Sequence, residues 1–305
     1  MIKHIRHDSM RTGVLYAMAL LIVIFLAGIG RPFSAHESGI FDPTVGVQKK
    51  PAYNVDAFKD ISVQAKAYVL YDVNSKEVII GRNEHQILPL ASITKVMTAL
   101  TAVHVASSST RIIVNKNSLD GGYDLGLKER QVWTLDELLK YTLVFSSNDG
   151  AQLIADSLLG RKAFIEKMNT YSGELGFSMS FSQPAGLDVG DELGGIGSAY
   201  DVARMMAYAR TTIPAILDAT TKTRTNVMAS TGEVRGIPNT NQLVNDFIGV
   251  EGSKTGFTDS AGGNLVLSVE ASLGRPVIIV VLGSTKEARF SDAYALYLAL
   301  IQSIQ

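Results

Sequence analysis

Apolar residues form one uninterrupted run near the start of the chain, from Gly13 to Ile29. A bilayer core of about 30 Å needs ~17–25 such residues, so the run has the length of a short membrane-spanning helix or of a long signal-peptide core. Cleavage after Ala35 would place Phe33 where a small residue is preferred. We therefore predict an uncleaved N-terminal anchor within residues 1–35. Three basic residues precede the run and predict a cytoplasmic N-terminus with an exported remainder: Lys3, Arg6 and Arg11.

The stretch after the anchor has no hydrophobic period. Residues 36–60 contain scattered breakers, among them Pro43, Gly46 and Pro51, and are predicted to be a linker. The periodic patterns begin after this stretch, so one folded domain is predicted over residues 61–305.

Two pairs of β-rich segments stand at opposite ends of the predicted domain. Ala67–Asp72 and Glu77–Gly81 flank one turn. Gly263–Glu270 and Pro276–Leu282 flank another. Strands at both ends predict one sheet built from distant segments, which is an α/β fold of the α+β type.

Helical periodicity fills most of the sequence between these pairs. Thr134 and Glu137 form a capping box that predicts a helix start, with Leu138 and Leu139 on its apolar face. The other predicted helices, the last of which follows the second strand pair, are Ser92–Val105, Gly150–Leu159, Lys162–Leu175, Tyr200–Arg210 and Asp292–Ile304.

Composition narrows the range of functions. Hydrophobic residues make up 46% of the chain, charged residues 19%, and the formal net charge is −1. There is no basic run beyond the first eleven residues, so no nucleic-acid partner is predicted. The absence of cysteine excludes disulfides, thiolate metal ligands and a cysteine nucleophile. Acidic residues are scattered, and neither a metal nor an organic cofactor is predicted.

The positions of the histidines do not support a Ser-His-Asp triad. Most of them lie in the anchor and linker, and the chain has neither a Gly-x-Ser-x-Gly elbow nor a His-Glu-x-x-His helix. The five are His4, His7, His36, His85 and His104.

A lysine-activated serine is the remaining hypothesis. Ser92 and Lys95 stand one helical turn apart, so both side chains lie on the same face of a predicted helix. At a helix start, free backbone N–H groups would help to stabilise an oxyanion near Ser92. Lys95 would accept the serine proton once burial and a second cation favour its neutral form. Alone, this spacing is common by chance, and a capping serine is the alternative.

Two further motifs occur once each. Ser-Ser-Asn at 146–148 follows the capped helix, and Lys-Thr-Gly at 254–256 opens the late strand pair. Lys254 would be the second cation, and the Thr255 hydroxyl could hold a substrate carboxylate. Gly256 suits a strand edge that a substrate backbone approaches closely.

The ordered set Ser-x-x-Lys, Ser-x-Asn and Lys-Thr-Gly resembles the signature of the penicillin-recognising serine acyltransferases. The surroundings are similar to those of the low-molecular-mass penicillin-binding proteins, the D-alanyl-D-alanine carboxypeptidases, over about residues 60–300. The resemblance implies a β-lactamase/transpeptidase-like fold, with a mostly antiparallel sheet flanked by helices and a mainly helical subdomain that holds Ser-x-Asn. The stretches that carry it are Leu88–Leu100, Ser147–Gly150, Gly197–Ala203, Asn239–Val244 and Glu251–Val266.

The resemblance implies a role for each motif residue. Ser92 would attack the penultimate D-Ala carbonyl of a peptidoglycan stem peptide and form an acyl-enzyme, while Lys95 takes its proton. Ser146 would relay a proton to the leaving group. Backbone N–H groups of Ser92 and Thr258 would form the oxyanion hole, and Arg289 would help to hold the terminal carboxylate. The substrate-binding residues implied are Asn148, Lys254, Thr255, Gly256, Thr258 and Arg289.

Departures from the family pattern leave alternatives open. Phe257 stands where several members carry histidine, and the sequence stops soon after the predicted closing helix, as in shorter chains that include DD-endopeptidases. A carboxypeptidase is therefore the first hypothesis and a cross-link-cutting endopeptidase the second. A β-lactamase would need a deacylation base, for which Glu166 is the one numerical candidate. A non-catalytic penicillin-binding sensor would be expected to lack a motif residue.

The implied partners follow from this family. They are a stem peptide ending in D-Ala-D-Ala, β-lactam antibiotics as covalent inhibitors, and the membrane through the N-terminal segment. The expected location is the extracytoplasmic face of a bacterial cell membrane, or the exterior if the segment is cleaved.

Overall fold

The computed structural model describes residues 53–116, 119 and 126–304. The predicted anchor in residues 1–35 and most of the predicted linker in residues 36–60 lie outside this part. Among the residues described, no helix has both the length and the apolarity needed to cross a membrane.

The last residues of the predicted linker pack on the domain. Phe58, in the short 3-10 helix η1 (Val55–Phe58), is buried in the core. The Tyr53 hydroxyl donates to Asp72 Oδ2 at 2.6 Å, and Tyr53 forms a β-bridge with Ile304 at the other end of the chain.

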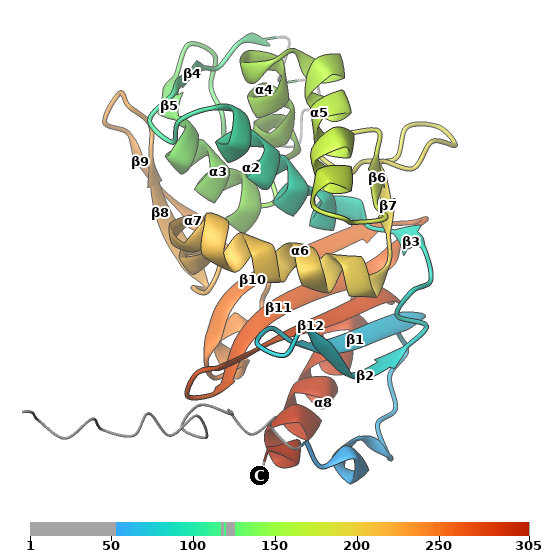
Figure 1. Cartoon of the computed structure of the whole chain (residues 1–305). Helices are drawn as coiled ribbons and strands as arrows, with labels where there is room; N and C mark the ends of the chain where they lie inside the picture. Colours follow the sequence, from blue (N-terminus) through green and yellow to red (C-terminus); the bar gives the residue numbers. More distant parts are fainter. Residues whose placement is uncertain (1–52, 117–118, 120–125, 305) are drawn as a thin grey trace, which may run out of the picture. The chain divides into compact units, whose positions relative to one another are not determined.

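The main sheet has five strands, all paired antiparallel, in the order β10-β11-β12-β1-β2 (Figure 1). β1 (Ala67–Asp72) lies between β2 (Glu77–Arg82) and β12 (Arg275–Ser284). β11 (Gly262–Ser272) joins β12 to the edge strand β10 (Val250–Thr258). The pairing of β1 with β12 confirms that one sheet is built from distant segments.

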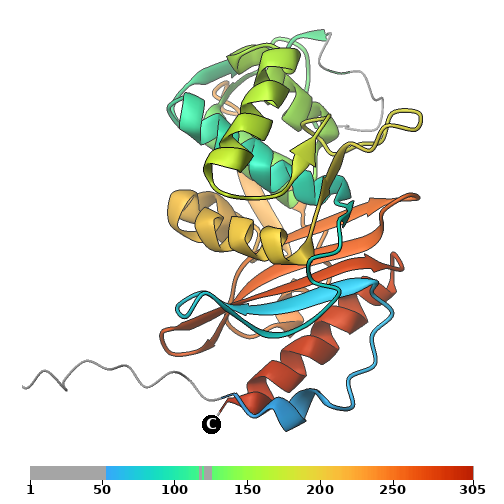
Figure 2. The same cartoon turned by 45° about the vertical axis from the view of Figure 1, so that its right-hand side comes forward.

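A helix layer covers each face of this sheet (Figures 1 and 2). On one face lies α8 (Ala288–Ser303), and on the other lies α6 (Ala199–Thr212). Alternate residues of β12 therefore enter two separate cores, with Ile279 on the α8 side and Val280 on the α6 side. Burial of both faces explains why this strand is a continuous apolar run.

The remaining large helices form a second layer above α6. The central one, α2 (Thr94–Val105), is buried along most of its length and contacts α3 (Leu135–Val144), α4 (Asn148–Leu158) and α5 (Arg161–Glu174). The shorter elements are β3 (Leu88–Pro89), η2 (Ala91–Ile93), β4 (Arg111–Ile113), β5 (Val132–Thr134), β6 (Ser180–Phe181), β7 (Gly195–Gly197), α7 (Pro214–Ala219), β8 (Arg224–Met228), β9 (Val234–Pro238) and η4 (Val244–Asp246). This arrangement confirms the predicted fold class.

Two predicted helix starts can be compared with the structure. The Thr134 hydroxyl accepts from the Glu137 backbone N–H at 3.3 Å, as the capping box predicts, but the Glu137 carboxylate accepts from the Met228 N–H on β8. The closing helix begins at Ala288, earlier than the predicted Asp292. The β8–β9 hairpin had no sequence prediction.

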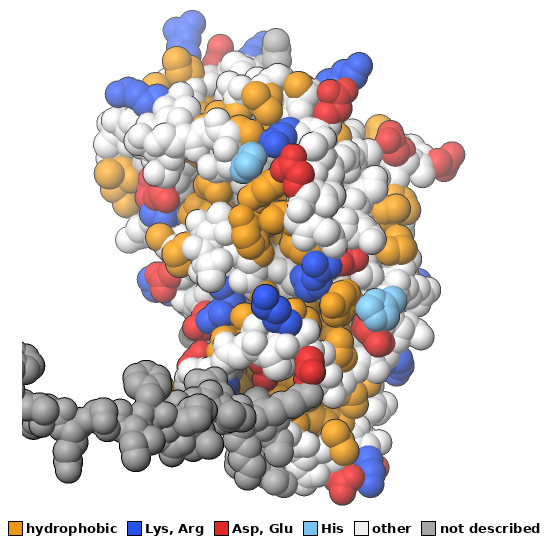
Figure 3. Space-filling view, in the orientation of Figure 1, with side chains coloured by type: hydrophobic (Ala, Val, Ile, Leu, Met, Phe, Trp, Pro, Cys, Tyr) orange, Lys and Arg blue, Asp and Glu red, His pale blue; other side chains and the backbone are white. Residues whose placement is uncertain are grey.

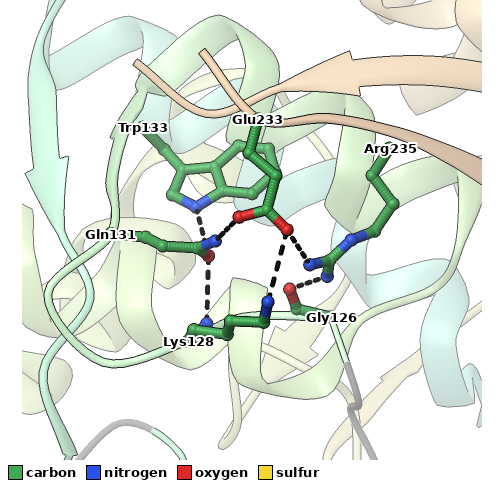
Figure 4. Close-up of polar contacts among 6 residues, drawn as sticks. All are labelled: Gly126, Lys128, Gln131, Trp133, Glu233 and Arg235. Carbon is green, nitrogen blue, oxygen red and sulfur yellow. Dashed lines mark hydrogen bonds and ion pairs between the residues drawn. The ribbon is translucent and has the colours of Figure 1, made fainter. Parts of the chain in front are cut away.

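The β8–β9 hairpin is fastened to the loop before β5 by polar contacts at its turn (Figure 4). Glu233 accepts a hydrogen bond from Gln131 at 2.6 Å and pairs with Lys128 at 3.4 Å and Arg235 at 2.9 Å. Arg235 also donates to the carbonyl of Gly126. We call Lys128, Gln131, Glu233 and Arg235 the Glu233 cluster. On the face shown in Figure 3, basic and acidic side chains are interspersed.

Candidate active site

Ser92 lies in the middle of η2, which leads directly into α2. Ala91 and Ile93 on either side are buried, whereas Ser92 is partly exposed. Ala91 has a φ of +49°, a left-handed conformation that costs a non-glycine residue on the order of 1–2 kcal/mol. The packing on both sides of Ser92 therefore holds a strained turn that presents its hydroxyl.

Lys95 is completely buried beneath Ser92. Its Nζ lies 2.9 Å from Ser92 Oγ, 2.8 Å from Asn148 Oδ1 and 2.8 Å from the carbonyl oxygen of Ala185. Three neutral oxygen atoms thus surround the amine. In the charged state it donates to them, and in the neutral state Ser92 can donate to it.

Ser146 lies in the turn between α3 and α4, and Asn148 is the first residue of α4. The residue between them, Ser147, is buried and caps α4 by accepting from the Gly150 N–H at 2.7 Å. Ser146 has a φ of +63°, a second strained position for a non-glycine residue. This turn brings the Ser146 and Asn148 side chains to two buried lysines.

Lys254 lies on the edge strand β10 and is buried. Its Nζ donates to Ser146 Oγ at 2.8 Å and to the carbonyl oxygen of Thr255 at 2.7 Å. Burial lowers the pKa of Lys254 well below its usual range, and the positive charges of Lys95 and Arg289 lower it further.

The other end of the site carries hydroxyl and guanidinium groups. The Thr255 hydroxyl is hydrogen-bonded to the Thr240 hydroxyl at 2.7 Å. Arg289, from the first turn of α8, donates from one terminal nitrogen to the carbonyl oxygen of Gly256 at 2.7 Å. Its Nε is buried without a hydrogen-bond partner among the described residues. Burial lowers the pKa of Arg289.

Gly256 is required for close packing between β10 and η2. A Cβ at this position would lie 2.8 Å from the carbonyl oxygen of Leu90 and 3.3 Å from the Cβ of Ala91. The sequence predicted a glycine for a closely approaching substrate. In the structure, the turn that carries Ser92 makes the close approach.

The structure corrects the prediction for Thr258. The Ser253 N–H donates to Thr220 Oγ1 and so faces away from β11. Because N–H groups alternate along an antiparallel strand, the Phe257 N–H also faces the free edge of β10, whereas that of Thr258 faces β11, where Thr258 pairs with Gly262. Thr258 therefore does not present its N–H to the site.

One open cavity of about 240 Å³ collects these groups. The two lysines lie behind its wall and are hydrogen-bonded to the residues that form it. The lining residues are Ser92, Ser146, Asn148, Leu187, Thr240, Thr255, Gly256, Phe257 and Arg289. Of the residues to which the family resemblance assigned a catalytic or substrate-binding role, the cavity and its wall contain all except Thr258.

Three contributors to the site had no assigned role in the sequence. Ala185 supplies a carbonyl oxygen to Lys95, and Leu187 and Thr240 line the cavity. The residues around Thr240 belong to one of the stretches that resemble the family, which was the available signal. In the part of the chain that the structure describes, no cluster of His, Asp or Glu residues is arranged to hold a metal ion.

Comparison with models of known protein families shows the family of this chain. Residues 53–286 match the model described as D-alanyl-D-alanine carboxypeptidase. The chain belongs to this family. It is 29% identical over 238 residues to the D-alanyl-D-alanine carboxypeptidase DacF of Bacillus subtilis (strain 168), a match that covers 75% of this chain and 60% of DacF.

Two further proteins are similar to this chain. The chain is 30% identical to a D-alanyl-D-alanine endopeptidase of Haemophilus influenzae over 66% of this chain and 69% of that protein. Penicillin-binding protein D2 from Listeria monocytogenes, solved with cefotaxime bound, superposes with a TM-score of 0.69 at 29% identity, covering 79% of this chain and 98% of that one.

Proposed function

We propose that this protein is a serine D-Ala-D-Ala carboxypeptidase that removes the terminal D-Ala of peptidoglycan stem peptides through an acyl-enzyme on Ser92. The main support for the proposal is that two serine–lysine hydrogen bonds lie at the wall of one cavity. Lys95 Nζ lies 2.9 Å from Ser92 Oγ, and Lys254 Nζ lies 2.8 Å from Ser146 Oγ. One pair suits activation of the nucleophile and the other suits protonation of the leaving group.

Acylation begins when Ser92 Oγ attacks the carbonyl carbon of the penultimate D-Ala. The neutral Lys95 amine accepts the hydroxyl proton. Negative charge develops on the carbonyl oxygen, and backbone N–H groups of Ser92 and Phe257 stabilise it. Phe257 takes this role in place of Thr258 because its N–H faces the free edge of β10.

Departure of D-Ala completes the first half of the reaction. The C–N bond breaks, and the leaving nitrogen receives a proton through Ser146 Oγ. Lys254 donates a hydrogen bond to Ser146 Oγ and so orients it, and Asn148 binds the substrate amide. Water then attacks the ester on Ser92, releases the shortened peptide and restores the hydroxyl.

The terminal carboxylate of the substrate fits the end of the cavity formed by Thr255 and Arg289. A guanidinium group and a hydroxyl are suitable partners for a carboxylate. The Nε of Arg289 is buried and has no hydrogen-bond partner within the described part of the chain, as expected of a cation that completes its hydrogen bonds when a ligand is present.

The location of the substrate agrees with the N-terminal sequence. Peptidoglycan lies outside the cytoplasmic membrane, and the apolar run Gly13–Ile29 supports anchoring there through residues 1–35. We therefore place the catalytic domain on the extracytoplasmic face of the membrane.

Penicillin labelling tests the proposal. Intact mass spectrometry of the domain after incubation with penicillin is expected to give one adduct on Ser92, and the domain is expected to release D-Ala from a pentapeptide. Ser92→Ala should lose both, while Ser109→Ala, an exposed control, should keep both. An adduct on another residue would overturn the assignment of Ser92, and labelling without D-Ala release would indicate a penicillin-binding sensor.

The rate of recovery from penicillin distinguishes a β-lactamase. No carboxylate is among the described residues that line the cavity, and Glu166 is exposed on α5. We therefore expect the adduct to persist. Rapid turnover of penicillin would contradict the proposed wall-peptide substrate.

A further inference from the structure

Two threonine hydroxyls lie at the same end of the catalytic cavity, and their protons are used differently. Thr255 Oγ1 donates to Thr240 Oγ1 at 2.7 Å. Because a hydroxyl has a single proton, this bond occupies the donor of Thr255. Thr240 accepts the bond and keeps its own proton, for which no acceptor exists among the described residues. Within this part of the chain, the hydroxyl donor left free at this end of the cavity therefore belongs to Thr240.

The exposure of the two residues also favours Thr240 as the one that meets a ligand. Thr255 is only 4% exposed, whereas Thr240 is partly exposed, and both line the cavity. Arg289 lines the same cavity, and one of its terminal nitrogens is already bonded to the carbonyl oxygen of Gly256. A carboxylate at this end can therefore receive hydrogen bonds from the Thr240 hydroxyl and from Arg289.

Hydrogen bonds on both sides fix the backbone position of Thr240. Its N–H donates to the carbonyl oxygen of Val144, at the end of α3, at 3.1 Å. The neighbouring Asn239 is buried, and its side chain donates to the carbonyl oxygen of Thr220 at 2.7 Å. Thr220 Oγ1 accepts from the N–H of Ser253 on β10 at 2.9 Å. None of these bonds uses the Thr240 hydroxyl, so they hold this residue at the cavity and leave its proton for a ligand.

We propose that Thr240 is a specificity-determining residue that donates a hydrogen bond from its hydroxyl to the terminal carboxylate of the substrate. The inference rests on the proposed function, in which this carboxylate lies beside Thr255 and Arg289, and it gives the two threonines different tasks. Thr255 donates to Thr240 and so orients and polarises its hydroxyl, since hydrogen bonds in a chain strengthen one another. Thr240 then donates to the carboxylate. A substrate without this carboxylate gains nothing from the chain of hydrogen bonds.

Two substrates with the same acyl group separate carboxylate binding from acylation itself. One is a stem pentapeptide that ends in D-Ala-D-Ala. The other is the methyl ester of the corresponding tetrapeptide, whose leaving group is methanol and has no carboxylate. Thr240→Val keeps the shape of the side chain but removes its hydroxyl. We expect kcat/KM for the pentapeptide to fall at least about tenfold, the usual cost of a lost hydrogen bond to a charged group, and kcat/KM for the ester to stay within about twofold.

Three further variants complete the experiment. Thr240→Ser restores a hydroxyl and should keep kcat/KM for the pentapeptide within about threefold of the wild-type value. Thr211 is exposed on α6, so Thr211→Val is the control and should leave both substrates unaffected. Thr255→Val removes the orienting bond but not the donor. The ratio of pentapeptide to ester kcat/KM should therefore fall less in Thr255→Val than in Thr240→Val.

The outcomes distinguish this inference from the proposed function. If the wild type releases D-Ala from the pentapeptide but Thr240→Val does so equally well, the inference is wrong and the proposed function stands. An equal loss on both substrates in Thr240→Val would also overturn it, because the hydroxyl would then support the structure of the site and not the carboxylate. So would a larger fall of the ratio in Thr255→Val, which would make Thr255 the donor. Failure of the wild type to acylate on Ser92 would overturn the proposed function, and this inference with it.

Discussion

The catalytic cavity and the Glu233 cluster hold their cationic side chains in opposite ways. In the cavity, Lys254 is buried and donates to the neutral oxygens of Ser146 and Thr255. In the cluster, Lys128 and Arg235 are paired with the carboxylate of Glu233 at the surface (Figure 4). Each region attaches a β-strand to the helical part of the molecule. Because the Glu233 cluster does so with exposed ion pairs, a buried lysine is not needed for attachment.

The difference appears in the direction of the pKa shifts. Burial lowers the pKa of Lys254, which favours its neutral form. In the cluster, the hydrogen bond from Arg235 lowers the pKa of Glu233, which favours the charged form. A buried cation among neutral oxygens is poised to exchange a proton, whereas an exposed ion pair keeps its charge. The contrast supports catalysis in the cavity and attachment alone in the cluster.

Removal of the amine of Lys95 is expected to have the largest effect. Lys95→Met keeps an unbranched side chain of similar size but removes the nitrogen that lies 2.9 Å from Ser92 Oγ. We expect the rate of acylation by penicillin to fall by about 10²–10⁴, the usual contribution of a positioned proton acceptor. Time-resolved mass spectrometry of the adduct measures this rate. Lys162→Met, on the exposed face of α5, is the control, and a normal rate in folded Lys95→Met would refute the role of Lys95.

A methyl group at Gly256, on strand β10, should displace Ser92. In Gly256→Ala the new Cβ would lie 2.8 Å from the Leu90 carbonyl oxygen and would displace the turn that carries Ser92. Misplacement by about 1 Å can cost 10²-fold in rate, and we expect a loss of about this size with a lowered Tm. Gly173→Ala, in α5 with open space around the new Cβ, is the control. An active Gly256→Ala protein would show that β10 and η2 need not be in close contact.

Lys254→Met tests the pKa contrast through stability. Between its lowered pKa and the ordinary lysine value of 10.5, Lys254 is neutral in the folded protein but protonated in the unfolded chain. The unfolded state binds more protons, so the free energy of unfolding of the wild type rises with pH across this window, by at most about 1.4 kcal/mol per pH unit. Lys254→Met lacks this rise.

Urea denaturation at several pH values measures the difference. The stability of Lys254→Met relative to the wild type should be greatest at the acidic end of the window and should decrease as the pH approaches 10.5. Lys162→Met should show no such trend. A difference that is independent of pH would mean that Lys254 has the same pKa in the folded and unfolded states.

Much of the site could be predicted because its main residues are close together in short motifs. Ser92 and Lys95 share a helical turn, and Lys254 was placed just before the predicted late strand pair. The edge strand β10, on which Lys254 lies, was not itself predicted. Residues a few positions apart within a motif stay close together in the folded chain. Residue identity and local geometry were therefore sufficient to predict their contacts.

Contacts that depend on tertiary packing could not be predicted in this way. The Ala185 carbonyl reaches Lys95 from a loop without periodicity, and any residue type could supply that oxygen. Thr258 was assigned an N–H donor, but which N–H groups face a free edge depends on strand register, which the sequence does not specify. The start of α8 was missed because Glu287 at its N-cap makes no side-chain capping bond.

The smallest effect is expected in the Glu233 cluster. Glu233→Gln keeps an oxygen for Lys128 and Arg235 but removes the charge of an exposed side chain, so we expect Tm to fall by less than about 2 °C at pH 7 and catalysis to be unchanged. Because the pKa of Glu233 is lowered in the folded state, the contribution of its charge is present above the carboxyl's ordinary value of 4.5 and is lost as the pH falls below it. Glu129→Gln, an exposed neighbour in the same loop, is the control for the charge change alone. A large loss of stability or of acylation in Glu233→Gln would mean that the cluster does more than fasten the hairpin, and the contrast with the cavity would fail.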